Sequence, residues 1–369
     1  MNQKTIHLIE PTLQDETGHC CGYVTALLEA SKNTDLKLEL WIGNKAEPLF
    51  NNYSKKHCFF QRRLRKLQTI FLYYRLLKNQ ETIFIPTAGQ FDLGVLSWLS
   101  TFIATKNSHI FLHFHQYKIT DKKILALKKI AANHPEFNIL APTAKLLSIF
   151  TDHGFKNCFL APCPSHIRSN TKTKFSGVFK YILYAGAARN DKGFSTLVKL
   201  INYLDEIKSN IPVVVQISPN HVGRYDEKTE LAVQELKKSS YPYLTIYQTS
   251  LSKNAYLDLF EDAICLQLYD HNIYQDKFSG VTLDALYAAC PIITTEGTTW
   301  ISDTVNRFEA GTVVNDLTPA NLHLEIEKIS ANYAKIQQNA LHAGEILRVE
   351  HDPLNTLKII DQRISLCQP

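Results

Sequence analysis

The sequence lacks several features that would each define a class of protein. None of its segments approaches about 20 uninterrupted apolar residues, which excludes a membrane-spanning helix. The first residues, Met1 to Lys4, are polar and the apolar run after them is only strand length, so we expect no secretion signal. The chain has no internal repeat and no low-complexity tract, and its composition, 45% hydrophobic and 20% charged, is ordinary for a soluble globular protein.

Cysteine is present, but without a pattern that indicates a disulfide framework or a metal site. The eight cysteines form no C-x-x-C pair, and Cys20 and Cys21, adjacent in sequence, are poorly placed to bridge each other. We therefore expect reduced, mostly buried thiols in a cytosolic protein. No Ser/His/Asp order and no activated Cys/His pair can be defended, and no cluster of metal ligands appears. We expect no metal ion and no cofactor.

Length and charge indicate two unlike halves. A chain of 369 residues exceeds what one hydrophobic core usually supports, which predicts two domains. Residues 1–165 contain 20 Lys and Arg against 12 Asp and Glu, whereas residues 166–369 contain 20 against 23. The net positive charge of the protein therefore lies in its first half.

The basic surplus is concentrated in residues 55–78, where cations alternate with aromatic and aliphatic side chains. The cations include Arg62, Arg63, Arg65, Lys66 and Arg75, and the apolar residues include Phe59, Phe60, Leu64, Leu67, Ile70, Phe71 and Tyr74. A basic helix with such a face can lie on an anionic membrane surface. The alternative is a helix packed on its own sheet with a solvated basic edge. Nucleic acid is a weaker candidate, because no basic or aromatic stripe continues elsewhere.

Strand-like apolar runs alternate with helix-length amphipathic segments along the whole chain. The expected strands are Thr5–Glu10, Leu36–Gly43, Thr82–Pro86, His109–Phe114, Phe137–Ala141, Tyr181–Ala185, Val213–Ser218, Leu244–Tyr247, Ile264–Leu268, Pro291–Thr295 and Gly311–Val314. The segments between them predict helices, among them Gln61–Leu77 and Pro319–Gly344. Continuous apolar strands between helices indicate parallel sheets covered on both faces, so the predicted fold class is α/β with two doubly wound halves.

The boundary between the halves falls in Pro162–Gly177, a polar stretch that contains proline. We expect a first domain over residues 1–165 and a second over residues 175–350. Ligands of open α/β sheets bind outside the carboxyl ends of the strands, so two such domains facing one another would leave a cleft between them.

Residues 276–293 have the pattern of an anion site followed by a sugar-binding carboxylate. Ser279 can cap a helix through its hydroxyl, while Gly280 lets a ligand approach the backbone, so that N–H groups and the positive end of the helix dipole face outward. Asp284 lies one turn deeper on the same face, where it can accept hydrogen bonds from a sugar diol. The pattern predicts a nucleotide-sugar pocket. The alternative is a capped helix whose Asp284 faces solvent.

This segment resembles the C-terminal signature of retaining glycosyltransferases of the GT-B fold, the group 1 or family 4 set. In that family a Glu, seven residues and a second Glu precede an Ala-rich helix and a Gly-Pro-Val-Ile strand. Asp276 and Asp284 occupy the two acidic positions here, and the run 288–293, AACPII, follows. Residues 269–280 and 297–300 are similar to one bacterial branch. The resemblance implies two Rossmann-like domains facing an interdomain cleft, with the final helix, about 353–365 within residues 351–369, crossing back onto the first domain.

Further donor residues follow from the resemblance. The family has Gly-Arg at the first strand end of its second domain and Lys-Gly at the helix start; Gly186 and Lys192-Gly193 correspond to these, and Arg189 stands two residues late. Two cations, Arg189 and Lys192, with Lys277 and the helix tip at Gly280 and Val281, suit a diphosphate leaving group without a divalent ion. In the family the first acid, here Asp276, contacts the transferred sugar. Two exposed cations in a turn are the alternative.

The first half contributes weaker signals. Gly18 and His19 resemble the family's N-terminal glycine loop, which faces the donor, although a plain loop would look much the same. His113 and His115 lie at the carboxyl end of an expected strand, and the family places near this point a His that hydrogen-bonds the transferred sugar. A structural strand histidine is the alternative, and which of the two reaches the sugar stays open.

These observations predict a cytoplasmic bacterial enzyme, with attachment to the inner face of the cytoplasmic membrane as an option. It would move a hexose from a nucleoside diphosphate sugar to a glycan or lipid-linked acceptor with retention, in surface polysaccharide synthesis. The expected partners are that donor, that acceptor and an anionic membrane surface, not nucleic acid. The rivals are another GT-B activity, such as an epimerase or phosphorylase, and a noncatalytic partner subunit that binds the nucleotide sugar.

Overall fold

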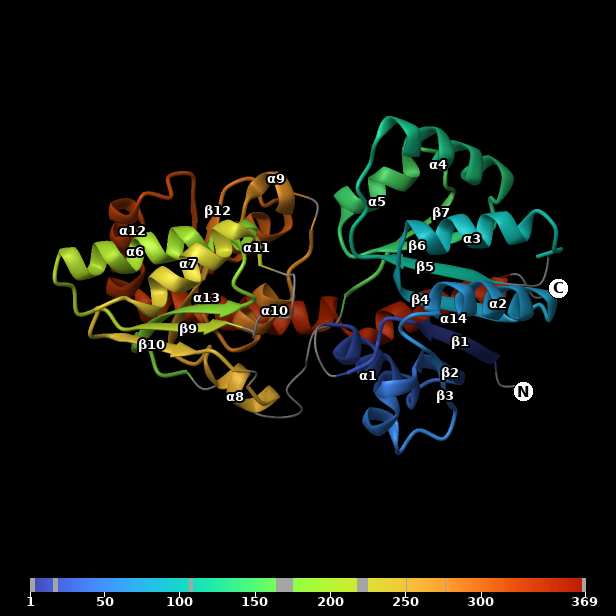
Figure 1. Cartoon of the computed structure of the whole chain (residues 1–369), viewed down its shortest axis with the longest axis horizontal. Coiled ribbons are helices and arrows are strands. Elements are labelled where there is room, and N and C mark those ends of the chain that lie inside the picture. Colours follow the sequence, from blue (N-terminus) through green and yellow to red (C-terminus); the bar gives the residue numbers. More distant parts are fainter. Residues whose placement is uncertain are drawn as a thin grey trace. The chain divides into compact units, whose positions relative to one another are not determined.

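The computed structural model describes residues 4–15, 19–105, 109–163, 175–217, 225–249, 251–275 and 277–366. The chain forms two compact units, one of residues 1–167 with 350–369 and one of residues 168–349. Each unit is built on one parallel sheet, with seven strands in the first and six in the second (Figure 1). The predicted α/β class is therefore confirmed, and all eleven predicted strands are present. None of the helices in the described ranges is long and apolar enough to cross a membrane.

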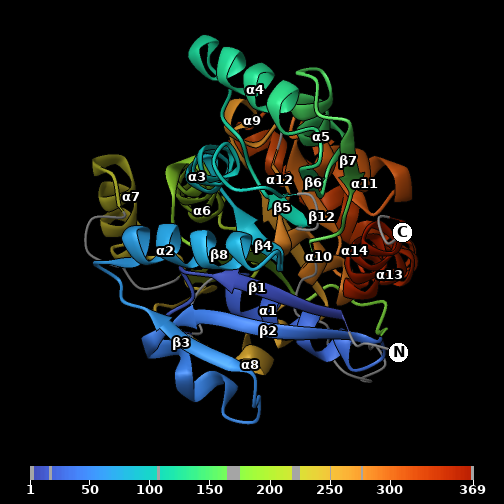
Figure 2. The same cartoon turned by 90° about the vertical axis from the view of Figure 1, so that its right-hand side faces the viewer.

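The sheet of the first unit has the strand order β3-β2-β1-β4-β5-β6-β7. Every neighbouring pair is parallel, and Figure 2 shows β1, β2 and β3 side by side. The strands are β1 Lys4–Glu10, β2 Leu36–Gly43, β3 Lys56–Phe60, β4 Thr82–Ala88, β5 Ile110–Phe114, β6 Asn138–Ala141 and β7 Asn157–Leu160. Because the order reverses direction between β1 and β4, the helices cover both faces.

Two hydrophobic cores lie on the two faces of this sheet. The helical elements are α1 His19–Ser31, the 3₁₀ helix η1 Asn44–Phe50, α2 Arg65–Lys78, α3 Gln90–Ser100, α4 Asp121–Asn133, α5 Ala144–Thr151 and α14 Pro353–Leu366. One core contains residues of α2, α3, α4 and α5, and the other residues of α1 and α14. Polar contacts also hold α14 on this unit: Lys4 Nζ lies 2.9 Å from Asp361 Oδ1, and Arg363 Nη2 donates to Asn157 Oδ1 at 2.9 Å.

The second unit repeats the arrangement with the strand order β10-β9-β8-β11-β12-β13, again all parallel. Its strands are β8 Tyr181–Gly186, β9 Val213–Ile217, β10 Leu244–Tyr247, β11 Ala263–Gln267, β12 Ile292–Thr295 and β13 Gly311–Val314. Its helical elements are the 3₁₀ helix η2 Asn190–Lys192, α6 Phe194–Glu206, α7 Glu227–Lys237, α8 Lys253–Asp258, α9 His271–Tyr274, α10 Gly280–Tyr287, α11 Trp300–Phe308, α12 Pro319–Ala331 and α13 Tyr333–Glu350.

Two helix predictions were wrong in their extent. The helix predicted over Gln61–Leu77 begins only at Arg65, and the basic stretch 55–78 does not form one helical face, because Lys56–Phe60 forms strand β3, paired with β2. Phe60 is consequently buried in the core and Phe59 packs edge-on against Trp41, so neither residue supplies an exposed apolar face. The predicted helix Pro319–Gly344 is interrupted at Asn332, whose backbone is not helical, and this residue separates α12 from α13.

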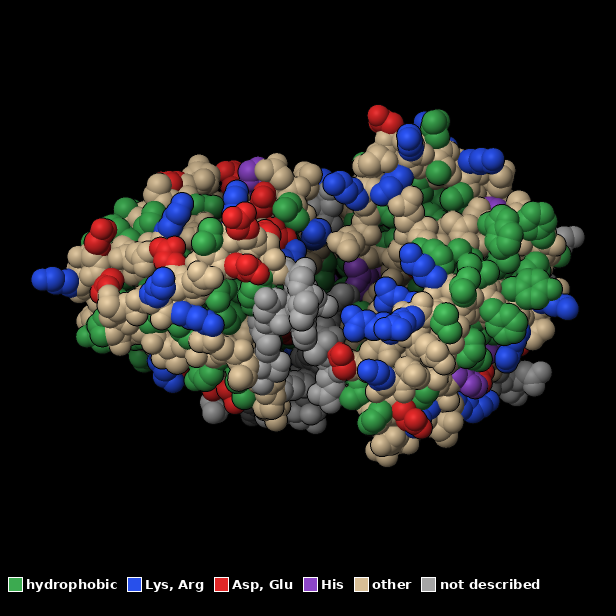
Figure 3. All heavy atoms as spheres, in the orientation of Figure 1, with side chains coloured by type: hydrophobic (Ala, Val, Ile, Leu, Met, Phe, Trp, Pro, Cys, Tyr) green, Lys and Arg blue, Asp and Glu red, His purple; other side chains and the backbone are tan. Residues whose placement is uncertain are grey.

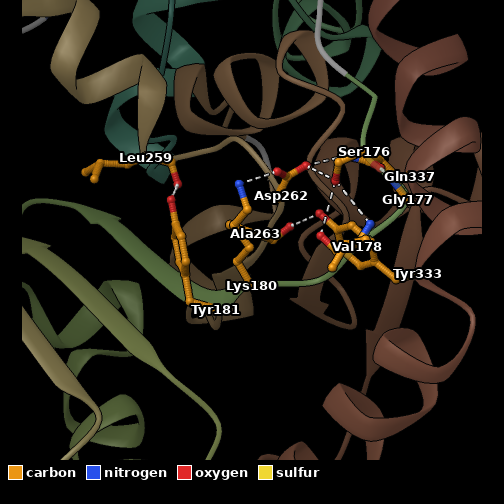
Figure 4. Close-up of polar contacts among 10 residues, drawn as sticks. All are labelled: Ser176, Gly177, Val178, Lys180, Tyr181, Leu259, Asp262, Ala263, Tyr333 and Gln337. Atoms are coloured by element: carbon orange, nitrogen blue, oxygen red, sulfur yellow. Dashed lines mark hydrogen bonds and ion pairs between the residues drawn. The ribbon is translucent and has the colours of Figure 1, made fainter.

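A polar cluster around Asp262 secures the start of β8 in the second unit (Figure 4). Its carboxylate accepts hydrogen bonds from Ser176 Oγ at 2.5 Å and Gln337 Nε2 at 3.2 Å, and lies 2.7 Å from Lys180 Nζ. Burial raises the pKa of Asp262, but these three partners outweigh it and hold the pKa below its usual value. The cluster lies at the beginning of β8 and β11, which leaves the carboxyl ends of these strands for a binding site.

Candidate functional site

The carboxyl end of β8 brings together three of the residues that the sequence assigns to the donor. Gly186 has a left-handed backbone, with φ of +117°. A Cβ atom at this position would lie 3.5 Å from Lys192 Nζ and 3.9 Å from Val281 Cγ2. The amide of Gly186 donates to Gln216 Oε1 at 2.9 Å, which holds the turn in place. Gly186, Lys192 and Val281, distant in sequence, thus lie around one point.

Lys192 lies on an aromatic surface at this point. Its Nζ lies 5.6 Å from the centroid of the Tyr269 ring. Burial, followed by the charge of Arg189, lowers the pKa of Lys192 to about 8; Lys277 lowers it further and Asp191 opposes the shift. A partly desolvated cation close to other cations gains more from a bound anion than an exposed lysine does.

Lys277 lies on a second tyrosine. Its Nζ is 5.1 Å from the Tyr274 ring, and that ring packs on Tyr269 with 4.4 Å between centroids. Burial and the Arg189 charge lower the pKa of Lys277, against the effect of Asp191. Tyr269 and Tyr274 are therefore a platform under both lysines. Local sequence did not assign the tyrosines a role, although both come shortly before Lys277.

Arg189 is paired with an acid of its own turn. Its Nε donates to Asp191 Oδ1 at 2.8 Å, and its Nη2 contacts Asp191 Oδ2. The charges of Arg189 and Asp191 both influence Lys192 and Lys277, so the four side chains are electrostatically connected. Within the described part of this edge of the sheet, three cations against one carboxylate leave an excess of positive charge, which suits an anionic ligand.

The predicted capping role of Ser279 is wrong. Ser279 is the N-cap residue of α10, but its side chain makes no cap hydrogen bond. The hydroxyl instead acts on the Tyr269 phenol: burial raises the pKa of that phenol, and Ser279 partly opposes the shift. The backbone carbonyl of Ser279 accepts from Thr282 N at 3.2 Å. Because the hydroxyl does not occupy the first turn, it does not compete there with a ligand.

Gly280 offers a direct test of ligand approach. A Cβ atom added to Gly280 meets nothing within 4 Å, so Gly280→Ala should leave the free energy of unfolding unchanged or raise it by up to ~1 kcal/mol, since alanine favours helix. If a diphosphate approaches this backbone, we expect UDP affinity in calorimetric titration to fall by about tenfold, or ~1.4 kcal/mol. Gly94→Ala, equally unobstructed but on α3 of the other unit, is the matched control. Equal UDP affinities in all three proteins would contradict the prediction.

Asp284 does not face solvent, so the alternative interpretation, a capped helix with a solvent-exposed Asp284, is wrong. The residue is 8% exposed and belongs to α10, which is tied to β11 by a hydrogen bond from Thr282 Oγ1 to Gln267 Oε1 at 2.6 Å. Burial and then the charge of Asp284 raise the pKa of the Tyr256 phenol. Burial also raises the pKa of the Cys265 thiol, and the charge of Asp284 adds to this shift.

The two histidines of the first unit differ in their environments. His113, the fourth residue of β5, is fully buried; its Nδ1 lies 2.5 Å from the Tyr23 hydroxyl, and burial lowers its pKa to about 3. His115 follows the end of β5, is half-buried, and has both ring nitrogens 3.7 Å from Cys163 Sγ. The two rings are 4.8 Å apart, as expected for side chains on one side of the chain. His113 is thus a neutral core group, and His115 is the more accessible one.

The sequence did not indicate a buried carboxyl of the first unit, that of Glu10. Glu10 ends β1 and is fully buried; Thr12 N donates to its Oε1 at 3.2 Å, and the hydroxyls of Thr12 and Thr87 also donate to it. Burial raises the pKa of Glu10. The pairing of β1 with β4 brings Glu10 and Thr87 together, and a local motif does not reveal this. Three predicted site residues cannot be placed: Gly18 and Asp276 lie outside the described residues, as does the side chain of His19.

Comparison with known proteins shows similarity in structure only. No protein-family model and no curated protein matches the sequence. Among solved structures, a glycosyltransferase from Rickettsia africae is 14% identical with a TM-score of 0.69, over 99% of both chains. Anabaena HepE in complex with UDP-glucose is 12% identical with a TM-score of 0.65, over 98% of both chains. The trehalose-6-phosphate protein from E. coli, bound with UDP-2-fluoro glucose, is 11% identical with a TM-score of 0.62, over 98% of this chain and 99% of the other.

These similarities define the fold. The two parallel sheets match two-domain GT-B glycosyltransferases over nearly the whole length of the chain. The protein therefore has the GT-B fold that the sequence predicted. At 9–14% identity the similarity shows the fold alone, and the activity has to be argued from the site.

Proposed function

We propose that this protein is a glycosyltransferase that takes its sugar from a nucleoside diphosphate sugar. The observation that carries the proposal is the position of Lys192, which lies beside Gly186 and Val281 at the carboxyl end of β8, on the ring of Tyr269. Ligands of doubly wound sheets bind at this edge. Two structures with the same fold, those from Anabaena and E. coli, hold UDP-sugars, which supports the same class of donor here.

In the proposed mechanism, the second unit stabilises the leaving diphosphate. Lys192 and Lys277, with the first turn of α10, would bind the diphosphate oxygens, and their attraction would strengthen as the bond to the sugar breaks. Three cations would neutralise the leaving group without a divalent ion, so we expect EDTA to leave donor hydrolysis unchanged. In this proposal Asp276 would contact the transferred hexose, with the reaction retaining configuration. No general base is assigned; electrostatics and proximity would supply most of the rate.

The acceptor in this proposal is a growing glycan or a lipid-linked sugar in the synthesis of bacterial surface polysaccharide. Activity is tested with UDP-, GDP- and ADP-sugars, each scored for slow donor hydrolysis and for a thermal shift. Hydrolysis of one donor with release of the retained anomer, followed by NMR, is the expected result. A thermal shift without hydrolysis would instead indicate a subunit that only binds the nucleotide sugar. If no donor is hydrolysed and none gives a thermal shift, the proposal is wrong.

Asp284 should determine affinity for the ribose. If its carboxylate accepts hydrogen bonds from the ribose hydroxyls, Asp284→Ala leaves these hydroxyls unpaired in a buried site. The free energy of UDP binding, measured by calorimetric titration, should then weaken by roughly 1–3 kcal/mol. The control is a ligand: 2′,3′-dideoxy-UDP lacks both hydroxyls, so wild type and variant should bind it equally. A loss of the same size for UDP and its dideoxy analogue would assign Asp284 a structural role only.

A further inference from the structure

Helix α2 has an apolar stripe that does not face the core. Leu72, Tyr73, Leu76 and Leu77 point into the sheet, whereas Leu64, Leu67, Phe71 and Tyr74 are exposed, with Leu67 at 68% and Phe71 at 60%. The spacing of three, four and three residues places these four side chains on one side of the helix. A two-sided apolar helix on the surface of a unit indicates a second contact partner.

Helix α3 extends this surface. Trp98 is 58% exposed and Phe102, just after the helix, is 76% exposed, with their rings 5.9 Å apart. The two helices are neighbours, because Lys66 Nζ of α2 lies 5.8 Å from the Phe91 ring of α3. We call the exposed residues of 61–78 and 90–102 the α2–α3 face. Figure 3 shows hydrophobic side chains gathered over these helices, with Lys and Arg next to them.

The charges of the α2–α3 face have one sign. Five cations are exposed: Arg62, Arg63, Lys66, Arg75 and Lys78. The one acid in these two segments is Asp92, which accepts hydrogen bonds from the Tyr73 hydroxyl and the Gly89 amide, each at 2.8 Å. The cations therefore have no carboxylate of their own segments to pair with, and the complementary surface is anionic.

We infer that the α2–α3 face docks on an anionic lipid bilayer. Exposed Trp and Phe side chains next to Lys and Arg partition into the membrane interface. The rings enter the headgroup region, and the cations contact phosphate groups. A protein partner would require a complementary acidic and apolar surface, which nothing in this structure identifies. The inference goes beyond the proposed function and does not rest on it, because the α2–α3 face and the donor residues belong to different units.

Flotation of the full chain with vesicles tests the inference. We expect binding to phosphatidylcholine vesicles that contain phosphatidylglycerol, little binding to phosphatidylcholine alone, and weakening by salt. Reversal of Arg62, Arg63 and Lys66 to glutamate should weaken binding on the order of a hundredfold. Trp98→Ser with Phe102→Ser should remove the part of the binding that persists at high salt. Brominated lipids should quench the fluorescence of Trp98. The Trp98→Phe variant should bind the vesicles normally but lose this quenching.

Matched variants in the second unit are the controls. Lys228, Lys237 and Lys238 on and after α7 are exposed and receive the same reversal to glutamate, and Leu231→Ser, at 59% exposure, corresponds to the aromatic change. All variants should unfold at the wild-type temperature and hydrolyse a soluble donor at the wild-type rate, which separates this test from that of the proposed function. Equal flotation of control and α2–α3 variants, no flotation at low salt, or a dimer that Trp98→Ser dissociates would each overturn the inference.

Discussion

Replacement of Lys192 by glutamine is expected to lower the rate of donor cleavage by about 10²-fold or more, while donor affinity falls much less. The reason is that the ammonium group lies where the diphosphate charge would develop, on the Tyr269 ring and beside Gly186. Its interaction with the donor is therefore weaker in the ground state than in the transition state. Steady-state kinetics of donor hydrolysis, with separate calorimetric titration of UDP, distinguishes the two effects.

Two further variants make this result specific. Lys199→Gln removes an exposed cation of α6, seven residues away, and should leave both quantities unchanged. Lys192→Arg keeps the charge and should retain much of the donor affinity. If Lys192→Gln cleaves the donor at the wild-type rate, the residue is only a buried cation and the proposed mechanism fails.

Lys192 should also make donor binding depend on pH. Its pKa is lowered to about 8 by burial, Arg189 and Lys277, and it is charged only below that pH. A bound diphosphate favours the charged form, so affinity should be nearly constant below pH 8 and fall by up to about tenfold per unit above it. Lys192→Arg should remove the part of this fall that Lys192 causes, because arginine stays protonated throughout; a fall that remains would belong to Lys277, whose pKa burial also lowers. Calorimetric titration of UDP between about pH 7 and pH 10 measures this pH dependence of the affinity.

The second large effect is expected for Gly193→Ala, which should destabilise the protein by roughly 2–4 kcal/mol and impair donor binding. Gly193 has φ of +76°, and a Cβ atom there would lie 2.1 Å from the backbone oxygen of Leu268. The turn that carries Lys192 would have to move away from the end of β11. Urea unfolding and UDP titration of the same preparation report the two losses.

Gly177→Ala separates backbone conformation from collision. Gly177 has φ of +71°, but a Cβ atom there meets side chains and no backbone: the Ala334 methyl group at 3.3 Å and the Phe175 ring at 3.8 Å. This variant should lose about 1 kcal/mol, mainly from the unfavourable φ with a small addition from the Ala334 contact, and its UDP affinity should be normal. A Gly193→Ala protein as stable as Gly177→Ala would show that the β11 contact is not needed to position the turn.

Part of the candidate site was visible in local sequence. Gly186, Lys192 and Gly280 each stand at a strand-to-helix turn, and such turns are written in short runs of neighbouring residues. The tyrosine platform was not predictable in this way, because the packing of Tyr269 on Tyr274 depends on how α9 turns after β11. Glu10 was missed for a similar reason: its hydroxyl partner Thr87 lies on another strand.

The wrong prediction for the basic stretch 55–78 has a physical cause. The helix was predicted over Gln61–Leu77, but the whole basic stretch 55–78, with Phe59 and Phe60, was treated as one helical face because apolar and basic residues recur through it. Pairing with β2 converts Lys56–Phe60 to a strand, a tertiary effect that overrides local periodicity. The apolar component of the α2–α3 face consequently comes from Phe71, Trp98 and Phe102, not from Phe59 and Phe60.

The sequence by itself determined the alternation of strands and helices, hence two parallel sheets, and the positions of the turns at their carboxyl ends. Periodicity and turn residues are local properties, and they suffice for this. Tertiary structure alone decided which side chains meet: Lys192 with Gly186, Val281 and Tyr269, and Lys66 of α2 with Phe91 of α3. It also decided that Asp284 and His113 are buried while Trp98 and Phe102 are not. Burial and proximity depend on strand order and helix packing, which join segments far apart in the chain.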